Sequence, residues 1–164
     1  MSSFYIDGYN LLFSMIENIP SCVESCRIEL IHLLDELILE AKINATVIFD
    51  NHSPLSTSKP SIEYQEFLHV VFSPKGLCAD KYILEIIQGS KNPKMITIVT
   101  SDIALTKEAR HLGASTISNE RFLQELSHKT KKKPEKKMTK DGPKELERLR
   151  TIFEERYKSL NELA

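Results

Sequence analysis

The sequence predicts an α/β domain in which helices cover both faces of a central, parallel β-sheet. Two observations support this prediction. Short runs rich in β-branched and aromatic residues recur along residues 1–128, with too little polar alternation for a half-exposed sheet. Longer segments with apolar residues at helical spacing separate these runs. Strands that alternate with helices indicate parallel strands joined by crossover helices, which is an α/β sandwich.

Five segments of this region are predicted to be strands. The first four are apolar runs without a polar face, so we expect helices to pack against both of their sides. The fifth is a short run that precedes the last helix of the region. In chain order the five are FYID at 4–7, ATVIFD at 45–50, FLHVVFS at 67–73, MITIVTS at 95–101 and ASTIS at 114–118.

The helices between these strands show recognisable end signals. The first long one opens with Ser21 and Glu24 at the spacing of a capping box and carries a wide apolar face. The next two have a glycine at or near their C-terminal end, Gly89 and Gly113, as helices often do. The helical segments are predicted at residues 20–42, 79–90, 102–113 and 119–126.

The chain changes character after this domain, which we assign to residues 1–128. Residues 129–140 hold seven lysines and one glutamate, a net charge of +6 in a chain of formal charge −1. They include Pro134 and only one large apolar residue, Met138. Such a segment cannot bury enough surface to order itself, so we expect a solvated linker over residues 129–142.

The spacing of apolar residues over 143–164 predicts a C-terminal amphipathic helix. Pro143 stands near its start, where the missing N–H costs nothing. A lone helix of this length is marginal in water, so its apolar stripe must be buried against the domain, a second copy of the chain or a partner protein. The sequence leaves these three alternatives open. The stripe consists of Leu146, Leu149, Ile152, Phe153, Leu160 and Leu163.

Composition narrows the class of protein. Apolar residues make up 41% of the chain and charged residues 27%, no apolar run could span a bilayer, and the N-terminus does not resemble a secretory signal. The three cysteines form no paired CxxC motifs, which suits a reducing compartment. We therefore expect a cytoplasmic protein that does not bind membranes. Cys22 and Cys26 could supply two zinc ligands, but a structural site needs four, so packing in the core explains them better.

Aspartates stand at the carboxyl ends of the predicted strands. Asp7 and Asp50 end the first two strands, Asp80 enters the helix after the third, and Asp102 follows the fourth. Ligands bind at this edge of an open parallel sheet. Each aspartate alone could be a helix cap or a turn residue. Four carboxylates at one edge, however, repel one another unless a cation or protons neutralise them.

Clustered carboxylates are ligands that Mg²⁺ and Mn²⁺ prefer. These ions are usually held by a few protein carboxylates together with substrate phosphate. Such a site favours phosphoryl transfer, in which the ion activates water and stabilises the charge on the attacked phosphate. No nucleophilic side chain of the protein is then required.

Several segments resemble the NYN-domain ribonucleases of the YacP-like group, which are relatives of the PIN nucleases. The resemblance covers about residues 3–127. DGYN after the first strand, AD at the start of a middle helix and TSD after a later strand are specific when they occur together in this order. The segments that match are IDGYNLL, VIFD, VVFSPKGLCADKYILEII, ITIVTSD and LGASTIS followed by Phe122.

The resemblance implies a PIN-like, Rossmann-like three-layer α/β/α fold and a metal-dependent endoribonuclease that uses Mg²⁺ or Mn²⁺. Asp7, Asp80 and Asp102 match the acidic site of the family, and Asp50 matches the acid after the second strand. Asn10 matches the polar residue of DGYN. It would fix a metal ligand, a metal-bound water or the scissile phosphate, or it would cap the helix after the first strand.

The chain departs from the usual pattern of the family near the third aspartate. The loop before Asp80 reads GLCAD, with Leu77 and Cys78 where an acidic residue is common. Leu84 stands four residues beyond Asp80, where the family often carries a glutamate. These differences remove peripheral acids and leave the three central ones.

Two other α/β classes fit less well. A phosphoacceptor receiver domain needs an acidic pair at the first strand and a lysine at the last, and neither is present. A dinucleotide-binding domain needs GxGxxG after its first strand, whereas DGYNLL has one glycine.

The lysine-rich segment fits an RNA partner, including mRNA on the ribosome, with DNA as a second candidate. Lysines supply salt-dependent affinity for phosphates and carry little sequence information. One alternative function is an inactive RNA-binding module that docks on the ribosome. Another is docking through the C-terminal helix, to a partner or as a homodimer. The lysines expected to contact RNA are Lys131, Lys132, Lys133, Lys136 and Lys137.

Overall fold

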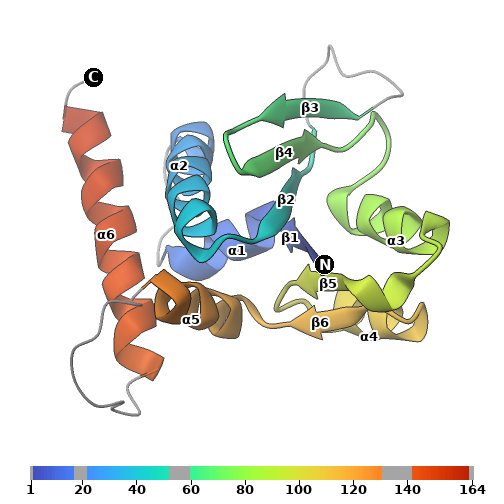
Figure 1. The fold of residues 1–164 in the computed structure, drawn as a ribbon. Helices are drawn as coiled ribbons and strands as arrows, with labels where there is room; N and C mark the ends of the chain where they lie inside the picture. The colour runs from blue at the N-terminus through green and yellow to red at the C-terminus, as the bar shows by residue number, and fades with distance from the viewer. Residues whose placement is uncertain (1, 17–21, 52–59, 131–141, 163–164) are drawn as a thin grey trace.

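The computed structural model describes residues 2–16, 22–51, 60–130 and 142–162. Its described residues form a six-stranded sheet in the spatial order β3-β4-β2-β1-β5-β6 (Figure 1). All neighbouring strands run parallel except β3, which pairs antiparallel with β4. The strands are β1 (Ser3–Asp7), β2 (Asn44–Phe49), β3 (Ser61–Tyr64), β4 (Leu68–Phe72), β5 (Ile96–Val99) and β6 (Ser115–Ile117).

Helices cover both faces of the sheet, which gives three layers. One buried apolar cluster joins the sheet to α1, α2, α5 and α6, and a second joins it to α3 and α4. This confirms the α/β class and the alternation of strands and helices. The helices are α1 (Gly8–Met15), α2 (Val23–Ala41), α3 (Ala79–Gly89), α4 (Ile103–His111), α5 (Asn119–Thr130) and α6 (Gly142–Glu162), with a short 3₁₀ turn η1 (Pro93–Met95).

Strand register brings the carboxyl ends of the central strands to one edge. Asp7 of β1 pairs with Ile48 of β2, and Ile6 pairs with Val99 of β5. The chain runs outward from β1 through β2 to β4, and β5 and β6 then extend the sheet on the other side of β1. The strand order therefore reverses at β1, and a reversal of this kind is where open α/β sheets place their ligands.

The elements differ from the predicted ones at two places. The antiparallel strand β3 was not predicted, because all four of its residues are exposed and carry no buried apolar pattern. The capping box did not form as predicted, because the N-cap of α2 is Cys22 and it makes no side-chain cap hydrogen bond. Ser21 itself lies outside the described residues.

Helix α6 packs on the domain that precedes it, along the outer side of α2 and α5 (Figure 1). Leu149 and Phe153 are buried in the same cluster as the core of that domain, and Ile152 packs against it. Of the three surfaces that the sequence left open, the structure thus places the stripe on its own chain. The side chains of the other three stripe residues, Leu146, Leu160 and Leu163, lie outside those described.

Polar contacts also hold α6 against the domain. The Arg150 guanidinium donates from Nη2 to the carbonyl oxygen of Ser14 at 2.9 Å. Arg156 donates two hydrogen bonds to the carboxylate of Glu36, at 3.1 and 2.8 Å. Bidentate pairs of this kind fix orientation as well as contact. The boundaries of the linker at 129–142 stay a prediction, because residues 131–141 lie outside the described part of the chain.

Truncating Phe153 to alanine should destabilise the whole domain. Its ring is fully buried in the core cluster, so Phe153→Ala should lower the free energy of unfolding by about 3–5 kcal/mol. Urea denaturation of the full chain measures this change. The exposed Lys158, on the same helix, is the control, and its alanine variant should change stability by less than about 0.5 kcal/mol. Equal midpoints for the two variants would mean that α6 does not pack on the domain in solution.

The described residues include no helix that combines the length and the apolar character needed to cross a bilayer.

Candidate active site

Asp7 is the last residue of β1 and lies at the centre of the carboxyl edge. It precedes α1 but makes no side-chain cap hydrogen bond to it. Its exposure is only 6%. Burial raises the pKa of this carboxyl group from 3.8 to about 7, and the neighbouring charge of Asp80 adds to the rise. A buried carboxyl group that does not cap its helix is costly to the fold, which makes it a candidate for function.

Asp80 lies against Asp7. It belongs to the first turn of α3, and the two carboxyl groups are close enough to share a hydrogen bond. Partial burial is the largest cause that raises the pKa of Asp80, while the hydrogen bond with Asp7 opposes the rise. Two carboxyl groups in contact cannot both ionise cheaply unless a cation or a proton compensates them.

Asp50 and Asp102 stand near this pair and act as helix caps. Asp50 follows β2, and its Oδ1 accepts a hydrogen bond from the backbone N–H of Ala79 at 2.6 Å, at the start of α3. Asp102 caps α4 by accepting from the N–H of Leu105 at 2.8 Å. The charges of both aspartates still contribute to the raised pKa of Asp80. The alternative that a strand-end aspartate serves as a helix cap therefore holds for Asp50 and Asp102. It does not describe Asp7 or Asp80.

Asn10 links two segments of the site. It lies inside the first turn of α1 and is not the N-cap, so the structure excludes one of the alternatives left open for it, that of a helix cap. Its Oδ1 accepts hydrogen bonds from the Ser101 N–H at 2.8 Å and from the Thr100 hydroxyl at 3.3 Å. The Asn119 side chain donates to the same oxygen at 2.8 Å. These bonds tie DGYN to TSD, the two motifs that the sequence analysis singled out.

Sequence reasoning missed three residues near the site. Asn119 is buried and begins α5, two residues after the last residue of β6. The strand-end rule that identified the aspartates would also have identified Asn119. Glu108 of α4 contributes to the raised pKa of Asp80 and lines a hollow between α3 and α4 together with Leu84. Nothing in the local pattern marks Glu108, because its proximity depends on how the two helices pack.

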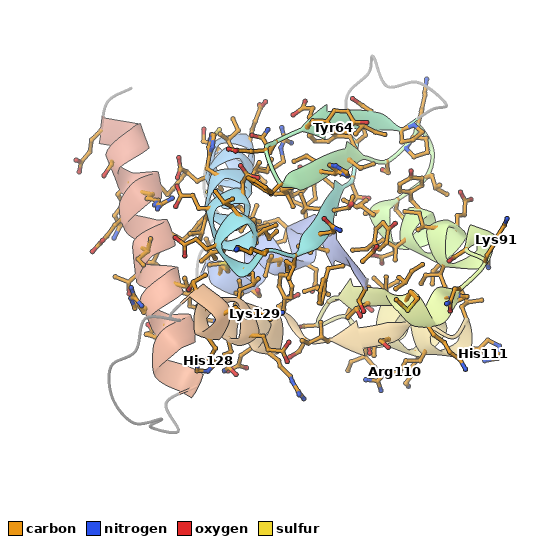
Figure 2. The ribbon with its side chains drawn as sticks, in the orientation of Figure 1. Tyr64, Lys91, Arg110, His111, His128 and Lys129 are labelled. Atoms are coloured by element: carbon orange, nitrogen blue, oxygen red, sulfur yellow. The ribbon has the colours of Figure 1, made fainter. Side chains whose placement is uncertain are left out.

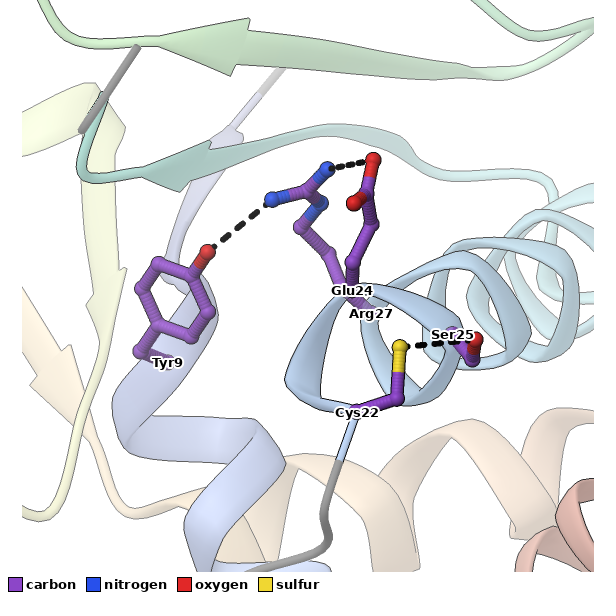
Figure 3. A network of polar contacts seen from close by, with 5 residues as sticks. All are labelled: Tyr9, Cys22, Glu24, Ser25 and Arg27. Atoms are coloured by element: carbon purple, nitrogen blue, oxygen red, sulfur yellow. Dashed lines mark hydrogen bonds and ion pairs between the residues drawn. The ribbon is translucent and has the colours of Figure 1, made fainter.

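Arg27 is the third residue that was missed. It extends from α2 toward the start of α1, where its Nη1 donates to the Tyr9 hydroxyl at 3.0 Å (Figure 3). Its guanidinium lies over the Phe72 ring, 5.0 Å from the centroid, and 5.9 Å from the centroid of Phe49. Arginine stacks well on aromatic faces, so Arg27 links α2 to the Tyr9 side chain and to the aromatic rings at the ends of β2 and β4. Figure 3 also shows Glu24, which pairs weakly with it at 3.5 Å.

The Asp7 and Asp80 pair fits a hard divalent cation. Mg²⁺ is commonly held by one or two carboxylates together with substrate phosphate. The charge repulsion and burial at this pair are what a bound cation would relieve. In the described part of the chain no three His, Cys, Asp or Glu side chains are grouped to hold a metal ion.

The predicted RNA-binding lysines Lys131, Lys132, Lys133, Lys136 and Lys137 lie outside the described residues. The described segment that precedes them ends at Thr130 in the last turn of α5, where His128 and Lys129 are exposed (Figure 2).

Comparison with known proteins identifies relatives of both sequence and fold. Residues 4–164 match the sequence family described as the YacP-like NYN domain. A crystal structure of a mutant form of Rae1 (YacP) from Bacillus subtilis is 21% identical, with a TM-score of 0.62 and coverage of 100% of both chains. A second structure of Rae1 (YacP) from Bacillus subtilis is 21% identical, with a TM-score of 0.60, and the match covers 99% of this chain and 88% of that one. No curated protein matches the sequence. The structural matches confirm the PIN-like α/β/α fold.

Proposed function

The chain belongs to the YacP-like NYN domain family, and from this membership and the geometry of the acidic site we propose that it is a metal-dependent endoribonuclease. Membership supports a nuclease-like role in RNA processing. The observation that carries the finer proposal is the contact between Asp7 and Asp80 at the point where the strand order reverses. A buried and a partly buried carboxyl group in contact there suit phosphodiester hydrolysis through Mg²⁺ or Mn²⁺.

In this proposal the polar residues of the site have three different roles. Asp7 and Asp80 hold the cation, which when bound supplies an activated water and neutralises charge on the phosphate. Asp50 and Asp102 keep the N-termini of α3 and α4 beside the pair through their cap hydrogen bonds, and their charges add to the affinity for a cation. Asn10 offers its amide hydrogens to a phosphate oxygen, because its Oδ1 is already engaged.

The substrate class in the proposal is RNA, including mRNA on the ribosome. The lysines of residues 131–137 would add affinity for phosphates that falls steeply with salt. A second candidate function is an RNA-binding module without cleavage. Its supporting observation is that one oxygen of Asp50 and one of Asp102 are engaged in cap hydrogen bonds, and that no three His, Cys, Asp or Glu side chains of the described residues are grouped to hold a metal ion.

Cleavage of RNA by the full chain tests this proposal. End-labelled single-stranded RNA, structured RNA and DNA of the same sequence are each incubated with protein in Mg²⁺, in Mn²⁺ and in EDTA. We expect internal cuts in RNA that require the metal and disappear in EDTA. Binding to every RNA without cleavage in either metal would overturn the nuclease proposal and favour the binding module. Preferential cutting of DNA would reassign the substrate.

A further inference from the structure

We propose that Asn119 is a positioning residue that orients the side-chain amide of Asn10, so that Nδ2 serves as the free hydrogen-bond donor beside Asp7. The inference rests on the proposed function for what the donor does, and on geometry alone for how it is held. Asn10 lies three residues after Asp7, in the first turn of α1, and its backbone N–H lowers the pKa of the Asp7 carboxyl group.

The oxygen of the Asn10 amide is fully used. It accepts from the Ser101 N–H and the Asn119 Nδ2, both at 2.8 Å, and from the Thr100 hydroxyl at 3.3 Å. A backbone N–H can only donate, so the Ser101 contact identifies the oxygen and excludes a flipped amide. An amide oxygen has two lone pairs, so three donors leave no capacity for a cation. The part of Asn10 that can act on a ligand is therefore Nδ2, which makes no hydrogen bond to another described residue.

Asn119 is the side-chain amide that holds this orientation together with the Ser101 N–H. Its Nδ2 donates to the Asn10 Oδ1 at 2.8 Å and also to the Asn10 backbone oxygen at 3.3 Å, so it holds both oxygens of that residue. Its own backbone N–H donates to the Ser101 hydroxyl at 3.3 Å. The Thr100 hydroxyl has a second task, since it accepts from the Asp102 N–H at 3.1 Å. Asn119 thus joins α5, the loop after β5 and α1 at one point.

The side-chain oxygen of Asn119, Oδ1, indicates that this residue contributes more to the orientation of the Asn10 amide than to the stability of the fold. Its exposure is 2%, and its Oδ1 is buried without a hydrogen-bond partner. Burying an unpaired acceptor costs free energy that offsets much of the gain from the two hydrogen bonds it donates. An apolar side chain would avoid this cost but would leave the Asn10 amide held from one side only.

Two substitutions separate orientation from packing. Asn119→Ala removes the donor, and Asn119→Asp keeps the shape but places an acceptor against two oxygens of Asn10. The control is Leu126→Ala in the same helix, which removes buried apolar contacts and touches neither asparagine. If Asn119 acts through Asn10, the loss of Asn10 orientation should be larger in Asn119→Asp than in Asn119→Ala. Leu126→Ala should behave like the wild type.

The first readout is the side-chain amide of Asn10 in ¹⁵N-labelled full chain, measured by NMR. We expect a distinct, dispersed pair of amide proton signals in the wild type and in Leu126→Ala. In both Asn119 variants the chemical shifts of this pair should move toward those of a solvent-exposed asparagine side chain. This readout does not depend on cleavage, so it decides the inference even if the protein proves not to be a nuclease. An Asn10 pair that is unchanged in both Asn119 variants would overturn the inference.

The second readout is RNA cleavage by single and double variants. Asn119→Ala should lower kcat about 10-fold with KM changed by less than about 2-fold, which is the lower end of the effects found for residues that orient the ligands of a metal site. In an Asn10→Ala background, the same substitution should lower kcat by less than about 2-fold, because the group that it orients is gone. An equal loss in both backgrounds would mean that Asn119 supports the fold instead. Absence of cleavage in the wild type would contradict the proposed function and leave the NMR result to stand by itself.

Discussion

Replacing Asp7 by asparagine should abolish metal-dependent RNA cleavage while the protein stays folded. The substitution preserves shape and removes the central charge of the site. Changes to groups that only orient a metal ligand cost about 10- to 100-fold, so loss of a direct ligand should exceed about 100-fold. The measurement is the cleavage rate at saturating Mn²⁺ with end-labelled RNA. Glu63→Gln, on the exposed strand β3, removes a carboxylate that is separated from β1 by two strands of the sheet, and it should cleave like the wild type.

Asp102→Asn provides a matched comparison at a cap. Asparagine caps helices about as well as aspartate, so the substitution removes charge and leaves α4 in place. We expect a smaller loss of cleavage than for Asp7→Asn, because the Asp102 carboxylate is engaged with Leu105. A loss as large as that of Asp7→Asn, at unchanged stability, would assign Asp102 to the metal site as a direct ligand. Wild-type cleavage in Asp7→Asn itself would refute the proposed site.

The second large effect is on stability as a function of pH. The folded-state pKa of Asp7 is about 7 against 3.8 in the unfolded chain, so the folded protein binds more protons between these values. The contribution of Asp7 is therefore most favourable below about pH 4 and is lost as the pH rises toward 7. Because the loss is on the order of a few kcal/mol, metal-free Asp7→Asn should be more stable than the wild type above pH 7.

Denaturation with urea at about pH 5 and about pH 8, with and without Mn²⁺, measures this effect. In the metal-free state the wild type should lose stability between the two pH values, relative to Asp7→Asn. Mn²⁺ should restore the wild type at the higher pH, where the carboxyl groups are ionised, and should stabilise it less at the lower pH, where protons compete. It should have little effect on Asp7→Asn at either pH. Parallel pH curves for wild type and variant would show that Asp7 is not a strained buried acid.

The position of α6 affects how recruitment is studied. Removing residues 129–164 takes Leu149 and Phe153 out of the core cluster as well as the lysine-rich segment, so the truncated chain would lose stability together with any RNA contacts. Substitution of the five lysines in residues 131–137 by glutamine avoids this problem. It leaves α6 in the chain and changes only the charge that the proposal assigns to RNA.

The strand ends illustrate what could be predicted about the site. Asp7, Asp50, Asp80 and Asp102 were found from the rule that parallel strands present their ends at one edge, and register does bring Asp7 to that edge. Their individual roles were not predictable, because an aspartate that caps a helix and one that is left without a cap bond occupy the same kind of sequence position. Only the contacts of Ala79 and Leu105 distinguish them.

The sequence by itself determined the class of the fold, because short continuous apolar runs and segments of period 3.6 depend only on local residue order. It also determined the amphipathic character of the last helix, the charge of the lysine-rich segment and the resemblance to a nuclease family. The tertiary structure decided where that helix packs, which carboxyl groups touch, and that three donors from α5 and the loop after β5 hold one amide of α1. Those outcomes depend on contacts between residues that are 90 or 109 positions apart in the chain. No local sequence pattern encodes such contacts.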